Sequence, residues 1–111
     1  MIDTPVNNAV LSESSRYMRL YQAVILTAVR ESCWSQQEAY NNFMWAKSDD
    51  GTLICDFANI NQRSLVKFFR RLSEDELLRD ETICNLHKAN RRHVTATRAF
   101  QSVIQQEFSY E

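Results

Sequence analysis

The residues of this sequence best suited to binding a ligand are the basic residues of segment 62–72, QRSLVKFFRRL. On a helix that turns by about 100° per residue, the cations fall on one side and the large apolar residues on the other. Such a helix is held in place by its apolar face and presents its charges to solvent or to an anionic partner. The cations are Arg63, Lys67, Arg70 and Arg71, and the apolar residues are Leu65, Phe68, Phe69 and Leu72.

The residues just before this helix fit the pattern of a helix-turn-helix unit, in which a tight turn joins a support helix to a reading helix. Cys55 is the small residue of the first helix, and Asn59, four residues later, can adopt a left-handed backbone conformation. Ile60 would fill the corner and Asn61 would cap the second helix. We therefore expect a helix-turn-helix-like corner at about 52–72, with an ordinary helical corner and a solvated basic face as the alternative.

If this corner binds double-stranded DNA, the position of each residue on the second helix predicts its role. Gln62, Arg63 and Lys67 stand in the first turns and would reach base edges, where an amide pairs with adenine and a guanidinium with guanine. Arg70 and Arg71 lie farther along and would contact phosphates. Reading helices commonly work in pairs, so this interpretation also favours a homodimer.

A second basic cluster follows in residues 87–98, HKANRRHVTATR. Residues 62–98 carry nine Lys and Arg against five Asp and Glu, whereas residues 1–61 carry four against seven. The cluster is either a secondary basic patch that contacts phosphates or a solvated face that balances the acidic residues of 74–81. Its cations are Lys88, Arg91, Arg92 and Arg98.

Residues 39–69, AYNNFMWAKSDDGTLICDFANINQRSLVKFF, resemble a group of small phage and prophage helical proteins. In that group a helix ends in Trp, and Ser-Asp, an apolar-Cys-x-x-Ala motif and a turn follow. The chain departs from the group at Asn59, where Gly is usual, and at Gln62, where Pro is frequent. The resemblance implies a small helical protein of phage type and names no target. The matching positions are Trp45, Ser48, Asp49, Ile54, Cys55, Ala58, Ile60 and Leu65.

Catalytic and metal-binding patterns are weak in this sequence. Cys84 and His87 form a single Cys-x-x-His pair, whereas structural zinc sites pair ligands on two segments. The carboxylates of 74–76 and of Asp49 and Asp50 suit helix starts, where the macrodipole favours negative charge. We expect no enzyme activity, no metal and no cofactor.

A non-enzymatic protein-binding module is the main alternative to DNA binding. A small phage-type protein of this kind could inhibit or remodel a host complex, such as transcription machinery or a defence system. Exposed aromatic side chains would then form the contact, although most aromatic residues of a small domain pack in its core. The aromatic candidates are Trp34, Tyr40, Trp45, Phe68, Phe69 and Tyr110.

The elements that must position these residues are helices. The chain has 111 residues, of which 44% are apolar, with one glycine and one proline, too few for many tight turns. We predict an all-α compact bundle of five to seven short helices, with residues 12–111 as a single domain and residues 1–11 as a flexible arm. Three unpaired cysteines, no long apolar run and no signal sequence favour the cytoplasm.

Capping signals and periodicity predict where the helices lie. The first runs from Ser12–Ser15 to near Cys33. Its inward stripe carries Tyr17, Leu20, Tyr21, Val24, Ala28 and one of Ile25 or Val29. Capping boxes at Ser35 and Ser73 predict the starts of two further helices. The helix that begins at Ser73 is expected to break near 80–82 or near Asn90. Gly51 supplies conformational freedom between helices. The last helix covers 95–108, and its apolar face carries Phe100, Val103, Ile104 and Phe108.

Overall fold

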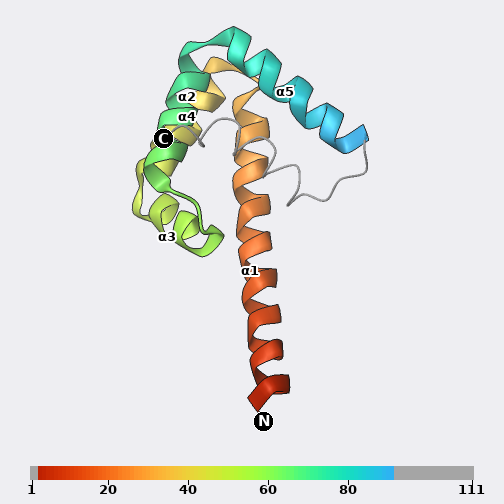
Figure 1. The fold of residues 1–111 in the computed structure, drawn as a ribbon. Coiled ribbons are helices and arrows are strands. Elements are labelled where there is room, and N and C mark those ends of the chain that lie inside the picture. The colour runs from red at the N-terminus through yellow and green to blue at the C-terminus, as the bar shows by residue number, and fades with distance from the viewer. Residues whose placement is uncertain (1–2, 92–111) are drawn as a thin grey trace.

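A computed structural model describes the backbone of residues 3–91 and the side chains of residues 16–88. Five helices, and no strand, occupy this part of the chain (Figure 1). The prediction of a small all-α bundle is confirmed, while the helix predicted over 95–108 lies outside the described residues. The helices are α1 (Asp3–Ser32), α2 (Gln36–Lys47), α3 (Asp49–Ala58), α4 (Gln62–Glu74) and α5 (Glu76–Arg91).

Helix α1 begins at Asp3 and therefore includes most of the segment predicted as a flexible arm, residues 1–11. Pro5 explains why this start is possible, since the first turn of a helix has no use for the N–H that proline lacks. The N-terminal half of α1 extends beyond the other four helices (Figure 1). The inward stripe predicted on α1 is only partly correct, because the face turned into the bundle is centred on Ile25 and Val29: Ala28 is buried, but Tyr17, Leu20 and Val24 are exposed.

Two serines set the start of α2 and the junction between α2 and α3. Ser35 caps α2 as predicted, because its hydroxyl accepts a hydrogen bond from the Glu38 N–H at 3.2 Å. Ser48 ends α2 and caps α3, accepting from the Gly51 N–H at 3.1 Å. A single residue thus separates the two helices, and the chain turns sharply between them.

Gly51 lies in the first turn of α3, and its role differs from the predicted one. No glycine in the described residues has positive φ, so conformational freedom is not what this position uses. The need is space: a Cβ on Gly51 would stand 2.6 Å from the carbonyl oxygen of Ala46 and also against that of Trp45. Gly51 therefore permits close contact between the end of α2 and the start of α3.

The capping box predicted at Ser73 is wrong by two residues. Ser73 is the buried penultimate residue of α4, and its hydroxyl donates to the Arg70 carbonyl at 2.6 Å. Asp75 caps α5 instead, accepting from the Leu78 N–H at 3.1 Å. From there α5 continues unbroken to Arg91, without the predicted interruption near 80–82 or Asn90.

Helices α2 and α4 form the centre of the bundle and make the most extensive contact between any two elements. They run antiparallel, because Gln62 at the start of α4 bonds Ala46 near the end of α2. Ala39 and Ala46 are fully buried, and these small side chains allow the two backbones to approach closely. The core is completed by α4 and α1, through Leu65, Phe68, Phe69, Leu72, Ile25 and Val29.

Candidate nucleic-acid interface

The corner between α3 and α4 has the backbone that the sequence predicted. Asn59 is left-handed, with φ 59° and ψ 46°, and is the one non-glycine residue with positive φ in the described part of the chain. The Ile60 N–H then donates to the Cys55 carbonyl at 2.9 Å, and that bond closes the end of α3. Asparagine tolerates this conformation better than other side-chain-bearing residues, so the turn forms without glycine.

Asn61 begins α4 in the predicted way. Its Oδ1 accepts a hydrogen bond from the Ser64 N–H at 3.0 Å, and this satisfies one of the unpaired donors of the first turn. Ile60, the residue before the cap, is partly buried and packs against the core. The two asparagines and the isoleucine thus fix the direction in which α4 leaves the corner.

Side chains from neighbouring helices satisfy the carbonyls at helix ends, and Gln62 is one of them. The buried Gln22 of α1 donates from Nε2 to the Ala58 carbonyl at 3.1 Å, at the last residue of α3. Gln62 donates from Nε2 to the Ala46 carbonyl at 2.7 Å. Gln62 was predicted to read a base, but in the structure its amide nitrogen holds α4 against α2.

The basic face of α4 is the set Arg63, Lys67, Arg70 and Arg71, and all four residues are exposed. The opposite face is buried, each of its four large apolar residues at 1% exposure or less: Leu65, Phe68, Phe69 and Leu72. This separation matches the sequence prediction. It also places both phenylalanines in the core, where they leave the basic face unobstructed.

The acidic residues at the start of α5 do not neutralise the predicted contact residues Arg63 and Arg70. Within the described residues, neither guanidinium forms an ion pair or a hydrogen bond with an acidic side chain. Arg79 of α5 reaches back to α4 instead, where its Nη1 donates to the Leu72 carbonyl at 2.6 Å. The contact between α4 and α5 therefore involves the end of α4 and leaves Arg63 uncovered.

The second basic cluster is described only in part. Lys88 is exposed on α5, next to the exposed His87. Arg91 is the last residue of α5, while its side chain and the residues Arg92 and Arg98 lie outside the described side chains. The secondary basic patch therefore remains a sequence prediction.

Sequence reasoning missed what anchors α4. In a helix-turn-helix unit the second helix packs on the first, but α4 contacts α2 far more extensively than it contacts α3. The available signal was the seven-residue spacing of Ala39 and Ala46, which puts two small residues on one face of α2. A small-residue face of this kind marks the side on which another helix can approach.

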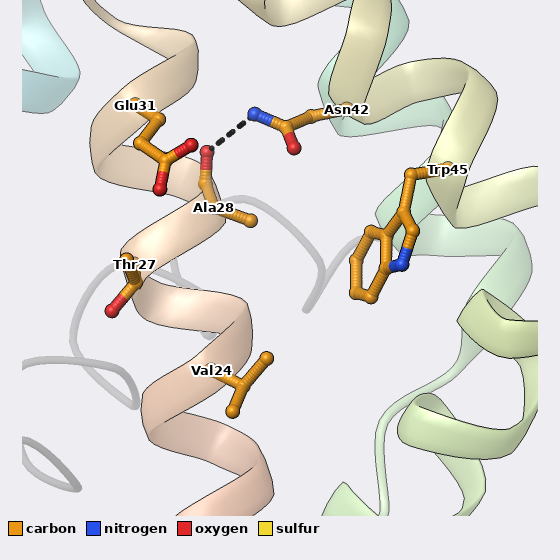
Figure 2. A pocket seen from close by; sticks show the side chains of 6 residues that line it. All are labelled: Val24, Thr27, Ala28, Glu31, Asn42 and Trp45. Atoms are coloured by element: carbon orange, nitrogen blue, oxygen red, sulfur yellow. Dashed lines mark hydrogen bonds between the residues drawn. The ribbon is translucent and has the colours of Figure 1, made fainter.

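A groove opens on another side of the bundle, between α1 and α2, and its walls are largely apolar (Figure 2). Asn42 ties the two helices together at the top of the groove, donating from Nδ2 to the Ala28 carbonyl at 3.1 Å and to Ser32 Oγ at 2.9 Å. Glu31 is the one carboxylate in the lining, so the groove is better suited to binding an apolar side chain than to acid–base chemistry. We call it the α1–α2 groove; it is lined by Val24, Thr27, Ala28, Glu31, Asn42 and Trp45.

The cysteines differ in their surroundings. Burial raises the pKa of Cys55, in the corner, to about 11, and the nearby Asp56 acts in the same direction. Burial also raises the pKa of Cys33 to about 11, although Arg79 partly opposes the shift. Both thiols are therefore protonated at neutral pH, and Cys84 is the exposed cysteine.

Comparisons of the chain with protein-family models, with curated proteins and with solved structures found no match. Across residues 3–91, no helix is both long enough and apolar enough to cross a membrane. The described residues also contain no group of three or more His, Cys, Asp and Glu side chains placed to hold a metal ion.

Proposed function

We propose that the protein binds double-stranded DNA through the basic face of α4. The observation that carries this proposal is the exposure of that face on a helix fixed by the Asn59–Asn61 turn, opposite a fully buried apolar face. A rigid, positively charged helix following such a turn is what major-groove readers present to DNA. In a small protein of phage type, this activity would serve transcription regulation.

The positions and hydrogen bonds of the side chains on α4 suggest a role for each of them in this proposal. Arg63, in the first turn of α4, is the side chain best placed to reach a base edge. Arg70 stands seven residues farther on, about 10 Å along the helix axis, and suits a phosphate contact. Gln62 is given no base contact in this proposal, because its Nε2 donates to the Ala46 carbonyl. Lys67 and Arg71 lie on the same exposed face of α4.

A salt-titrated mobility-shift assay with duplex DNA tests the proposal. The affinity should fall steeply as salt increases, because each neutralised phosphate releases counterions and adds about 0.9 to the slope of log affinity against log salt. The double variant Arg63→Glu/Arg70→Glu should weaken binding at least about 100-fold, since it removes one base and one phosphate contact and adds repulsion.

A matched control separates local contacts from net charge. Arg16→Glu/Arg19→Glu makes the same charge change on α1, where both arginines are exposed. The oligomeric state of this variant is measured alongside, so that a loss of affinity through α1 is distinguished from a loss of contacts on α4. This control should keep most of the affinity. No binding at low salt, or equal losses in the two double variants, would exclude the basic face of α4 as a DNA site.

A protein partner is the second candidate, favoured by the exposed aromatics near the start of α2. Trp34 is 69% exposed between α1 and α2, and Tyr40 is half exposed on α2. Aromatic residues are enriched at the centres of protein interfaces. Stoichiometric capture of one host protein that survives nuclease treatment and is lost in Trp34→Ala would favour this function over DNA binding.

A further inference from the structure

The exposed apolar surface of α1 is a continuous stripe. Tyr17, Leu20 and Val24 follow one another at three- and four-residue steps, which keeps them on one face of the helix. Their exposed fractions are 61%, 58% and 42%, large values for apolar residues in register. We call these three residues the α1 stripe.

The α1–α2 groove continues the α1 stripe. Val24 belongs to both, and Thr27 and Ala28 carry the same face of α1 upward into the groove. Figure 2 shows Trp45 of α2 facing this side of α1 across the groove. The apolar surface therefore runs along α1 from Tyr17 to the wall formed by Trp45.

The N-terminal half of α1 has no neighbour among α2–α5 for much of its length (Figure 1). A helix without tertiary contacts is marginal in water, so an extension of this kind calls for a partner. In the sequence, Val10 and Val6 stand seven and eleven residues before Tyr17 on the spacing of the stripe, with Glu13 at the position between Val10 and Tyr17. Apolar residues repeating at this interval are typical of the seam between two packed helices.

We propose that a second copy of this chain covers the α1 stripe, α1 packing against α1 about a two-fold axis. A long amphipathic helix matches the length and periodicity of the surface, and each copy supplies one. Helix α1 carries three acidic and three basic residues, Asp3, Glu13, Glu31, Arg16, Arg19 and Arg30, so two copies meet without net repulsion.

The size of the surface agrees with this assignment. A helix of this length is about 45 Å long and about 10 Å wide, a footprint on the order of 450 Å². That footprint is a little over half of the roughly 800 Å² per partner buried in specific interfaces, and the walls of the α1–α2 groove add to it. The inference does not depend on DNA binding, and its test uses no nucleic acid.

Sedimentation equilibrium of the full chain, with Leu20→Glu and Leu77→Glu beside it, tests the proposal. The unchanged chain should be a dimer at tens of micromolar. Leu20→Glu places a charge in the centre of the α1 stripe and should raise the dissociation constant more than 100-fold. Any loss of helical circular dichroism should be limited to the N-terminal half of α1, which loses its partner. Leu77 is 67% exposed on α5, and Leu77→Glu should leave the dimer intact.

Three outcomes overturn the proposal. One is a full chain that stays monomeric up to 1 mM, the scale of very weak binding, about −4 kcal/mol. Another is a dimer that Leu20→Glu does not weaken. The third is a monomer that Leu20→Glu destabilises far more than Leu77→Glu, which would mean that another segment of the same chain covers the stripe.

Discussion

Helices α4 and α1 are both amphipathic in sequence, yet the bundle treats their apolar faces differently. Each large apolar residue on the inner face of α4 is exposed by 1% or less, whereas Tyr17, Leu20 and Val24 on α1 remain 42–61% exposed. The difference follows from orientation: α4 packs its apolar face along α2, whereas α1 turns Ile25, Leu26 and Val29 into the bundle and leaves Leu20 and Val24 on another face. Periodicity in the sequence identifies the apolar face of each helix. Only the packing of the helices shows which of these faces is buried.

The largest expected change in the free energy of unfolding comes from a substitution on the buried face of α4. Phe68→Ala should lower the free energy of unfolding by about 3–5 kcal/mol, because it removes a fully buried ring and leaves a cavity. Urea denaturation followed by circular dichroism measures the change. A domain of this size has about 5–15 kcal/mol in total, so the variant should be close to unfolding.

The control for Phe68→Ala is Tyr17→Ala, also an aromatic truncation, on the α1 stripe. Under conditions where the chain is monomeric, it should change the free energy of unfolding by less than about 0.5 kcal/mol, as exposed substitutions generally do. A loss at Tyr17 comparable to that at Phe68 would contradict the contrast between the two helices.

A smaller effect is expected where two backbones touch. Gly51→Ala should cost about 1–3 kcal/mol, because the added Cβ meets the carbonyls of Trp45 and Ala46, and backbone atoms cannot rotate away. Thr27→Ala introduces the same residue at an exposed position of α1 and should be neutral or slightly stabilising, since alanine favours helix. Thermal and urea unfolding of both variants give the comparison. A neutral Gly51→Ala would mean that the junction between α2 and α3 is loosely packed.

The smallest effect concerns the cap that starts α4. Asn61→Ala removes the acceptor for the Ser64 N–H and should lower the free energy of unfolding by about 0.5–2 kcal/mol. Asn41→Ala, at an exposed position inside α2, serves as the matched control and should change little. If the two asparagine variants unfold at the same urea concentration, the cap adds nothing to α4.

Local sequence chemistry was sufficient to predict much of the candidate site. Asn59 and Asn61 act through their own backbone and the next three residues, so the left-handed turn and the cap could be predicted from the sequence. The division of α4 into a basic and an apolar face also follows from spacing alone. The capping box at Ser73 failed because Ser73 is buried in α4, and Asp75 two residues later offered the next cap.

The sequence by itself determined the helical class, the turn at Asn59 and the two faces of α4, because each depends on residues within one or two turns of one another. Only the tertiary structure decided that Gln62 bonds α2, that Gly51 serves close packing and that Tyr17, Leu20 and Val24 stay exposed. Those outcomes depend on which helices meet, and contacts between residues distant in sequence have no signature in local periodicity. For the same reason, whether a second copy of the chain packs on the α1 stripe must be measured, and sedimentation equilibrium provides that measurement.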